Sequence, residues 1–314
     1  MKPKKKPRAP LRVALIGAGR VGTVLGRVLF EEGGRITAVI SRSRSSARTA
    51  ASFLGCRRFS DDPGAIPRET DIVFIATPHD AVEGAAEALS RCEQLDFRRL
   101  AVCHASGMLT AAVLGPLALR GAAPFSFHPL QTFPRGFPPR RIVPSARGIW
   151  YGVDGPPAGL RCARKFARAL KGDVIEIPPG ARELYHAACV VASNHLTALL
   201  AVIREMYGSV RGEALPSLEA FRPIIESTIR NVFGSSPEEA LSGPVARGGV
   251  DTVRKHFEAV RGATPELLPY FAQMTQETVR LALRKGSLAG ERREALEQLV
   301  MSYTHAVPPS GNRT

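Results

Sequence analysis

Short apolar runs rich in β-branched residues alternate with stretches of helical composition over residues 11–178. The runs predict strands at residues 12–16, 36–40, 72–76, 100–104, 124–128, 149–153 and 174–177. The helical stretches are clearest at residues 20–32 and 81–91, and the pair Gly33-Gly34 supplies a stop signal after the first. Strands that alternate with helices build a parallel sheet with both faces covered, so the pattern predicts a doubly wound α/β fold.

The pattern changes after Pro178-Pro179-Gly180. Residues 181–210 contain no proline and no glycine before Gly208, and they are rich in strong helix formers. A helix of about 28 residues spans about 42 Å, which is long enough to bridge two domains or to form a dimer. Further helices are predicted at residues 218–233, 250–261, 265–285 and 292–302. The second domain is therefore expected to be all-α.

At 314 residues the chain is long enough for two domains, each with its own core. The predicted segments are a basic tail over residues 1–10, the α/β domain over 11–178, the helical domain over 179–306 and a loose tail over 307–314. Apolar residues make up 44% of the chain and charged residues 23%, which is typical of soluble globular proteins.

The formal net charge of +15 would suit a nucleic-acid-binding protein, so its distribution matters. Five of the 43 basic residues lie within the first eight positions, a pattern that predicts a disordered basic tail. The remaining arginines are scattered, and aromatic residues form only 6% of the chain, so no basic stripe with interleaved aromatics is present. The charge therefore favours solubility and anionic ligands. Nucleic-acid association through the tail is the weaker alternative.

The cysteines and the apolar segments bear on localisation. The five cysteines show no C-x-x-C spacing, which predicts neither a disulfide framework nor a zinc site and fits a reducing cytoplasm. No signal peptide is predicted, because the apolar run after the basic N-terminus is short. The most apolar long segment, 187–203, is interrupted by Ser193, Asn194 and His195, so a bilayer span is not expected. We expect a soluble, cytoplasmic protein without a membrane partner.

A glycine-rich turn joins the first predicted strand to the first predicted helix. It reads Gly17-Ala18-Gly19-Arg20-Val21-Gly22, which is the dinucleotide-binding pattern in its required context. Gly17 would allow the tight turn, Gly19 the approach of a pyrophosphate, and Gly22 the packing of helix against sheet. The helix N-terminus would face the phosphates with free N–H groups. The expected fold is thus a Rossmann-type parallel sheet followed by an all-α domain; an ordinary glycine turn is the alternative.

The residues after the second predicted strand indicate which dinucleotide binds. NAD specificity needs a carboxylate there to accept the ribose 2′-OH, and none is present. Ser41, Arg42, Ser43 and Arg44 stand there instead, and Arg20 lies in the adjacent turn. Guanidinium groups pair bidentately with phosphate, so this segment predicts NADP(H) as the cofactor. Surface charge in an arginine-rich chain is the alternative.

The predicted strand 72–76 runs into Ala76, Thr77, Pro78, His79 and Asp80. These residues stand at the carboxyl edge of the sheet, where ligands of open α/β sheets bind. We expect the first four of them to line the cofactor. A helix N-cap formed by Asp80 or Thr77 explains the segment equally well.

Two further strand ends carry polar side chains on the same edge, at residues 103–107 and 126–133. His128 is the leading acid or base, because hydride transfer to a carbonyl or imine leaves charge that an imidazole can neutralise. Ser106 is expected to hydrogen-bond cofactor or substrate, and Gln131 to contact the substrate. The alternative is that His128 and Gln131 only satisfy backbone groups in a proline-bounded loop.

The long helix and a later loop supply the remaining candidates. Tyr185 and His186 open the helix, and an α-helical register places His186, Val190 and Asn194 in one row. We expect this row to form a cleft wall, although polar pairing with a neighbouring helix is as well supported. Arg247, in the loop 243–248, would anchor a substrate carboxylate or phosphate, in the same chain or across a dimer.

These segments together resemble a family of bacterial proteins that join a Rossmann-like NADP-binding domain to a C-terminal helical domain of unknown function. The resemblance rests on residues 17–22, 76–80, 104–107, 127–133, 185–194 and 243–248, and FHPLQTF at 127–133 is its most specific part. That family is similar in architecture to pyrroline-5-carboxylate reductase, prephenate dehydrogenase, and the 6-phosphogluconate and 3-hydroxyisobutyrate dehydrogenases.

The resemblance also implies residue roles. Prephenate dehydrogenases have a serine after one strand and a catalytic histidine in a His-Pro turn after the next, and Ser106 and His128 stand at similar places. The 3-hydroxyisobutyrate enzymes use a lysine followed one turn later by an asparagine. Asn194 resembles that asparagine, but Val190 occupies the lysine neighbourhood, which argues against their mechanism. The family usually has Arg-Gly-Asp where this chain has Arg247-Gly248-Gly249, which departs from the pattern.

We therefore expect an NADP-dependent oxidoreductase that transfers a hydride between NADPH and a C=O or C=N group of a small anionic substrate. The predicted catalytic residues are His128, Ser106, Asn194 and His186, and the predicted substrate contacts are Gln131, Tyr185 and Arg247. A homodimer formed through the C-terminal helices is expected. No hydrolase elbow, P-loop or H-E-x-x-H metal motif is present in the sequence. The alternative from another class is a non-catalytic NADP(H)-binding sensor or scaffold.

Overall fold

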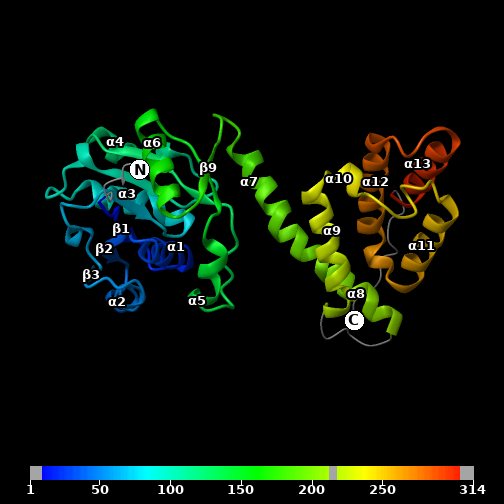
Figure 1. The fold of residues 1–314 in the computed structure, drawn as a ribbon, viewed down its shortest axis with the longest axis horizontal. Helices are drawn as coiled ribbons and strands as arrows, with labels where there is room; N and C mark the ends of the chain where they lie inside the picture. The colour runs from blue at the N-terminus through cyan, green and yellow to red at the C-terminus, as the bar shows by residue number, and fades with distance from the viewer. Residues whose placement is uncertain (1–8, 212–217, 305–314) are drawn as a thin grey trace, which may run out of the picture. The chain divides into compact units, whose positions relative to one another are not determined.

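The computed structural model describes residues 9–211 and 218–304. It divides into two compact units, residues 1–193 and 194–314, which are described separately (Figure 1). The predicted basic tail, apart from Ala9 and Pro10, and the predicted C-terminal tail lie outside the described residues.

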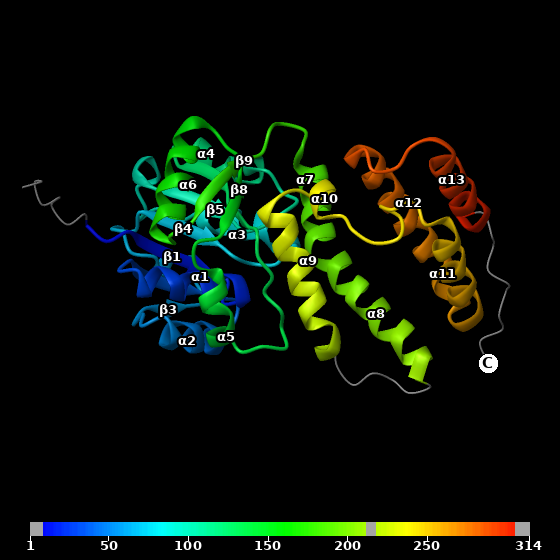
Figure 2. The same ribbon diagram turned by 45° about the vertical axis from the view of Figure 1, so that its right-hand side comes forward.

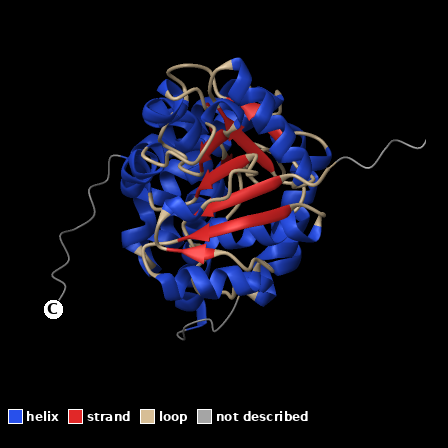
Figure 3. Cartoon of the chain, turned by 90° about the vertical axis from the view of Figure 1, so that its left-hand side faces the viewer, coloured by secondary structure: helices blue, strands red, loops and turns tan. Residues whose placement is uncertain are grey.

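A six-stranded parallel sheet forms the centre of the first unit, in the order β3-β2-β1-β4-β5-β6 (Figure 3). Its strands are β1 (Arg12–Ile16), β2 (Arg35–Ile40), β3 (Phe59–Ser60), β4 (Ile72–Ile75), β5 (Ala101–His104) and β6 (Ala123–Ser126). The prediction missed β3, because two residues are too short to show a periodic pattern. The strand order reverses between β1 and β4, the point at which doubly wound folds bind ligands. The predicted fold class is confirmed.

Helices cover both faces of this sheet. They are α1 (Arg20–Glu31), α2 (Arg44–Phe53), α3 (Val82–Ser90), α4 (Gly115–Leu119), α5 (Pro139–Ile142) and α6 (Pro157–Ala169). One buried cluster joins the sheet to α1, α2 and α6, and the other joins it to α3 and α4. The first helix ends as predicted, since Gly33 has φ of +84°, a left-handed conformation that favours glycine.

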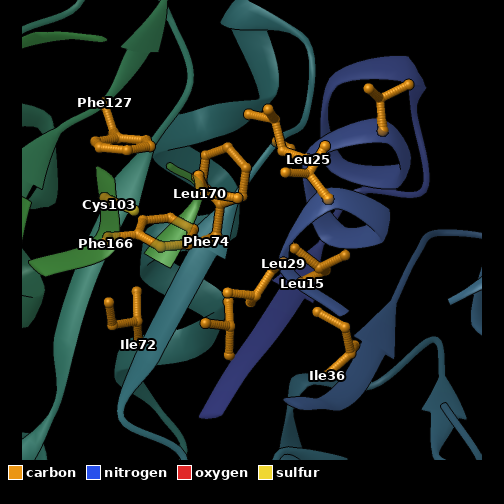
Figure 4. Close-up of a cluster of buried hydrophobic side chains, with 14 of the residues drawn as sticks. Leu15, Leu25, Leu29, Ile36, Ile72, Phe74, Cys103, Phe127, Phe166 and Leu170 are labelled. Carbon is orange, nitrogen blue, oxygen red and sulfur yellow. The ribbon is translucent and has the colours of Figure 1, made fainter. Parts of the chain in front are cut away.

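An aromatic stack forms much of the first cluster (Figure 4). Phe127 stacks between Tyr151 and Phe166, with ring centroids 4.1 and 4.7 Å away, and meets the edge of Phe74 at 6.3 Å. All four side chains are buried, and each contributes about 1.5–3 kcal/mol through burial. Because Phe127 directly precedes His128, this stack fixes the backbone that carries the histidine.

The last three strands form a separate small sheet, which corrects the prediction of a single sheet. They are β7 (His128–Pro129), β8 (Trp150–Val153) and β9 (Asp173–Glu176). β7 pairs with β8 antiparallel, and β8 pairs with β9 parallel. The chain leaves the main sheet at Ser126, whose N–H donates to the carbonyl of Asp154 at 2.9 Å. A pattern of apolar residues reports that a segment is extended but not which strand it pairs with, so this split was not predictable from the pattern alone.

The predicted long helix is present as one helical run with an irregular turn. α7 (Arg182–Val190) continues through a π-helical turn, Val191–His195, into α8 (Leu196–Arg211). The wider π turn interrupts the 3.6-residue repeat. The predicted row from His186 through Val190 to Asn194 is therefore wrong beyond Val190. Among the described residues, the helix Arg182–Val210 is long and apolar enough to cross a membrane by length and composition only, which is weak support for a membrane span.

The second unit is all-α, as predicted (Figure 2). Besides α8 it contains α9 (Arg222–Gly234), α10 (Pro237–Ala240), α11 (Val250–Ala263), α12 (Leu268–Lys285) and α13 (Gly290–Thr304). α11, α12 and α13 pack around one buried cluster, in which Phe257 stacks on Tyr303 at 4.4 Å. The prediction missed only the short α10 among these helices.

Candidate active site

The glycine turn between β1 and α1 has the geometry that its sequence predicted. Gly17 has φ of +109°, and a Cβ on it would fall 2.7 Å from the carbonyl carbon of Ala76. A Cβ on Gly22 would fall 2.7 Å from the carbonyl oxygen of Gly17. A Cβ on Gly19 would meet only the carbonyl oxygen of Ala76, at 3.7 Å. Gly17 and Gly22 are thus required by the fold, whereas Gly19 leaves the N-terminus of α1 open to a ligand.

The N-terminus of α1 suits the pyrophosphate of a dinucleotide. Gly19 is the N-cap, no side chain of the described residues caps it, and the first turn contains no acidic residue. The free N–H groups and the helix dipole at this end favour an anion. The buried hydroxyl of Thr77, beside the turn, has no hydrogen-bond partner among the described residues. These residues fit a bound dinucleotide.

A pocket of about 590 Å³ lies at this turn and collects several predicted cofactor residues. Its lining includes Gly19, Arg20, Val21, Ala76, Thr77 and Pro78, together with Phe133, Arg135 and Pro139. The Arg20 guanidinium donates to the carbonyl of Arg135 at 2.6 Å. The segment after the FHPLQTF motif therefore closes one side of the pocket, which the sequence did not predict.

The predicted 2′-phosphate residues follow β2 and are not in this lining. Arg42 is exposed beside the N-terminus of α2, with Ser41 before it. Ser43 is the N-cap of α2, and its hydroxyl accepts from the N–H of Ser46 at 3.4 Å. Ser43 thus has a structural role in addition to the role predicted for it.

The loop after β5 brings His79 and Ser106 together. Nδ1 of His79 lies 2.9 Å from the hydroxyl of Ser106. That hydroxyl also accepts from the N–H groups of Met108 and Leu109, at 3.3 and 3.2 Å. With two N–H donors on its oxygen, Ser106 donates its own hydrogen to His79. The structure therefore connects two residues that were predicted separately.

His128, Tyr185 and His186 meet beside Gly107. Nδ1 of His128 lies 2.8 Å from the hydroxyl of Tyr185, and the rings of His128 and His186 lie 5.7 Å apart. A Cβ on Gly107 would fall 2.9 Å from Nε2 of His128 and closer still to Nδ1 of His186. Only glycine fits between the two imidazoles. Tyr185, predicted to contact substrate, is here the partner of His128.

Burial keeps the imidazole of His128 uncharged at neutral pH. Burial lowers the pKa of His128 to about 4, and electrostatic interactions with His186 and Arg182 act in the same direction. Burial likewise lowers the pKa of His104 to about 4, and Nε2 of this ring lies 3.0 Å from the carbonyl oxygen of Thr110. Within the described part of the chain, no group of three or more His, Cys, Asp or Glu residues is placed to hold a metal ion.

A buried ion pair under this cluster was not predicted. Arg182, the first residue of α7, pairs with Asp154, which follows β8, and also contacts the hydroxyl of Ser126. The Ser126 hydroxyl donates to Asp154 at 2.7 Å, and Arg182 lies 3.5 Å from the carbonyl oxygen of Gly107. One signal for this pair is present in the sequence, the carboxylate of Asp154 directly after the predicted strand 149–153. No such signal marks Arg182, because arginine is common in this chain.

The remaining predicted site residues lie elsewhere. The amide of Gln131 donates to the carbonyl of Ser145 at 2.6 Å and accepts from the N–H of Thr132 at 2.7 Å. The nitrogen and the oxygen of this amide both bond backbone groups, which agrees with the alternative that Gln131 satisfies backbone groups in the loop. Asn194 and the exposed Arg247 belong to the second unit.

Comparison with known proteins identifies both parts of the chain. A model of the Rossmann-like domain matches residues 3–129, and a model of a domain of unknown function, DUF2520, matches residues 149–278. The chain is a Rossmann-like domain followed by a DUF2520 domain. The predicted resemblance is thereby confirmed, and the hydrogen bond between His128 and Tyr185 joins the two matched segments. No curated protein matches the sequence.

Solved structures of similar fold cover most of the chain. Protein TM1727 of Thermotoga maritima is 22% identical, with a TM-score of 0.65, over 87% of this chain and 99% of its own. A Bacteroides fragilis protein named as an NADP oxidoreductase is 19% identical, with a TM-score of 0.64, over 86% and 98%. A reductive aminase from Aspergillus terreus, in complex with NADPH4, cyclohexanone and allyl amine, is 14% identical, with a TM-score of 0.58, over 92% and 99%.

Two of the enzymes named in the resemblance also share the fold. They are a prephenate dehydrogenase from A. aeolicus and a pyrroline-5-carboxylate reductase from Coxiella burnetii, with TM-scores of 0.51 and 0.56. At identities of 16% and 15%, these likenesses show the fold alone. The chain therefore shares the fold of these enzymes, with a Rossmann-like first domain.

Proposed function

We propose that the protein is an NADP(H)-dependent oxidoreductase that transfers a hydride between NADPH and the C=O or C=N group of a small anionic substrate. The observation that carries this proposal is the continuity between the nucleotide pocket and the histidine cluster. Pro78 lines the pocket, and the next residue, His79, bonds to Ser106, whose neighbour Gly107 lies between His128 and His186. A nucleotide and a polar substrate group would therefore lie along one edge of the sheet.

The glycine turn, Gly17 to Gly22, would hold the pyrophosphate at the N-terminus of α1. Residues 76–79 would line the bound nucleotide, and Arg42 with Ser41 and Ser43 would receive the 2′-phosphate. The choice of NADP(H) over NAD(H) is supported by the absence of a carboxylate at the end of β2 in the sequence. The names of the Bacteroides and Aspergillus proteins agree with it.

When bound, NADPH would supply a hydride to the carbonyl or imine carbon of the substrate. His128 would give the oxygen or nitrogen atom its proton, so that the product is an alcohol or an amine. His186 would hydrogen-bond the same polar group, whereas the hydroxyl of Ser106, already bonded to His79, Met108 and Leu109, would position His79. The roles of Asn194 and Arg247 as substrate contacts are proposed from the sequence alone.

We also propose a cytoplasmic homodimer formed through the helical unit. Large apolar side chains on α9 are exposed in the single chain, with Ile224 at 65% and Phe233 at 87%. Exposed apolar surface of this kind marks an interface. Sedimentation should show a dimer, and a Phe233→Glu variant should shift it towards monomer; a monomeric wild-type protein would reject this proposal.

Two measurements test the oxidoreductase proposal. Calorimetric titration should show tighter binding of NADPH than of NADH, and equal affinities would reject the cofactor choice. A screen of keto acids and cyclic imines, followed by NADPH absorbance, should then find a substrate whose turnover falls by about 10²- to 10⁴-fold in His128→Ala. Unchanged turnover in that variant would remove His128 from its role. NADPH binding without turnover of any substrate would favour a binding protein instead.

A further inference from the structure

We infer that Tyr185 holds His128 as the neutral Nε2–H tautomer, so that His128 presents a hydrogen-bond donor into the space beside Gly107. Tyr185 thereby acts as a positioning residue for His128 and not as a substrate contact. The inference rests on the proposed function in one respect, that the atom accepting from the Nε2–H group is an oxygen or nitrogen of the substrate. The tautomer itself follows from contacts within the first unit.

The contact between Tyr185 and His128 decides which ring nitrogen carries the proton. The hydroxyl of Tyr185 lies 2.8 Å from Nδ1 of His128, so one hydrogen is shared between them. Gly152 is paired with His128 across β7 and β8, and a Cβ at this position would collide with the hydroxyl. A phenol O–H is more acidic than the N–H of a neutral imidazole, and an imidazole nitrogen is the better acceptor, so the hydroxyl donates to Nδ1. A neutral imidazole that accepts at Nδ1 carries its proton on Nε2.

A second ring nitrogen lies near the protonated nitrogen of His128. A Cβ on Gly107 would fall 2.9 Å from Nε2 of His128 and closer still to Nδ1 of His186, so both rings pack against Gly107. Nδ1 of His186 is buried and has no hydrogen-bond partner among the described residues. A donor on one ring and an unpartnered nitrogen on the next suit a ligand that carries a polar group.

Because the imidazole of His128 is neutral, its tautomer decides which ring nitrogen can donate a proton. The ring is neutral at pH 7, because burial lowers its pKa to about 4 with help from His186, Arg182 and His104. The doubly protonated imidazolium is therefore rare at pH 7, and the proton that His128 can give to a substrate is the one on Nε2. A neutral imidazole fixed by its second nitrogen is an established way to polarise a carbonyl.

The same contacts account for the proton after its transfer. The bond from Nε2 to hydrogen breaks as the substrate oxygen or nitrogen gains that proton, and the proton of the Tyr185 hydroxyl moves to Nδ1. The Arg182 guanidinium lies 5.8 Å from the centre of the phenol ring, where its charge favours the phenolate. Burial raises the pKa of Tyr185, so the phenolate is transient: Nδ1 returns its proton to the phenolate oxygen as Nε2 takes a proton from water. The imidazole remains neutral throughout.

Nitrogen-15 NMR of the full-length protein tests the tautomer without cofactor or substrate. The signals of His128 are identified by their loss in a His128→Asn variant. At pH 7 the wild-type protein should show Nδ1 as an unprotonated, hydrogen-bonded nitrogen and Nε2 as a protonated one. A proton on Nδ1, or a doubly protonated ring, would overturn the inference whether or not any variant folds.

A pair of tyrosine variants tests the role of the hydroxyl. Tyr185→Phe should give a mixture of tautomers and lower kcat by about 10- to 100-fold with KM changed by less than about threefold. The matched control is Tyr151→Phe, because the hydroxyl of Tyr151 is buried and has no partner among the described residues. The control should keep the wild-type spectrum and kcat. A wild-type His128 spectrum in Tyr185→Phe would overturn the inference. If the spectra change as expected while no substrate is ever turned over, the proposed function fails and the tautomer assignment stands.

Discussion

Arg182 and Asp154 form an ion pair that ties the first turn of α7 to the end of β8. Only 3% of the Arg182 side chain is exposed, whereas 40% is exposed for Arg164, which pairs with Glu176 nearby in the sequence. Burial lowers the pKa of Arg182, which reflects the loss of water around its charge. Both pairs join an arginine to a carboxylate, but the guanidinium of Arg182 is buried and that of Arg164 is exposed to water.

We expect Arg182→Met to destabilise the protein far more than Arg164→Met. Loss of the buried guanidinium leaves the Asp154 carboxylate without its cation, which costs about 3–5 kcal/mol of unfolding free energy. The exposed pair contributes about 0–1 kcal/mol, because water and salt screen it. Urea unfolding at pH 7 measures both variants. Equal and small losses would show that Arg182 is solvated in solution.

The double variant refines this prediction. Asp154→Asn combined with Arg182→Met should recover part of the lost stability, because no unpaired charge then remains under the sheet edge. Independent, additive losses would contradict a direct pair between these two residues.

Gly17→Ala should prevent tight cofactor binding and lower stability. The left-handed φ of +109° is strained for alanine, and its Cβ would lie 2.7 Å from backbone atoms of Ala76. We expect a loss of at least about 2 kcal/mol, since neither backbone segment can yield freely. Gly84→Ala is the matched control. A Cβ at Gly84, in α3, meets nothing within 4 Å, so this variant should gain about 0.5–1 kcal/mol. Thermal unfolding compares the two, and a stable Gly17→Ala protein would contradict the turn described here.

Stability should fall as the pH is lowered from about 6.5 towards 4, before most carboxylates titrate. The pKa values of His104 and His128 are both lowered to about 4 by burial. In this interval the unfolded chain binds protons that the folded chain excludes, so acid favours unfolding, by on the order of 3 kcal/mol per histidine at the lower end. The ring of His104 faces Thr110, Arg182 and His79. The ring of His128 faces Tyr185, His186 and Arg182.

Urea unfolding at pH 7, 6 and 5 measures this dependence. A His104→Gln variant keeps an N–H donor for the carbonyl of Thr110 and removes one titrating ring. It should therefore lose about half of the pH dependence of the unfolding free energy. The same dependence in the variant and the wild type would show that His104 does not contribute.

Local features of the site were predictable because neighbouring residues create them. The strand Arg12–Ile16 and the turn after it depend on a run of apolar residues and on glycines a few positions apart. The strand ends carrying Ser106 and His128 follow from the same pattern, since carboxyl ends of parallel strands share one edge.

The partners of these residues were not predictable from local pattern. Tyr185 lies 57 positions from His128, and Arg182 lies 56 positions from Ser126. Only the folded chain brings them together. The π turn, Val191–His195, was also hidden, because its composition is that of an ordinary helix. Periodicity identifies elements, whereas the contacts between distant elements decide which candidate residues act together.

The proposed preference for NADP(H) depends on Arg42, and a charge reversal at this residue tests it. Arg42→Asp should weaken NADPH binding by about 10- to 100-fold, because a guanidinium–phosphate pair of about 1.5–3 kcal/mol is lost and a repulsion replaces it. NADH binding should be unchanged or tighter, since a carboxylate at this position accepts from the ribose 2′-OH. Arg48→Asp is the matched control, because Arg48 is also exposed on α2 and changes the net charge equally. Calorimetry with both nucleotides should therefore show a change of preference in Arg42→Asp alone. Equal losses of NADPH affinity in both variants would mean that long-range charge, and not contact at Arg42, attracts the cofactor.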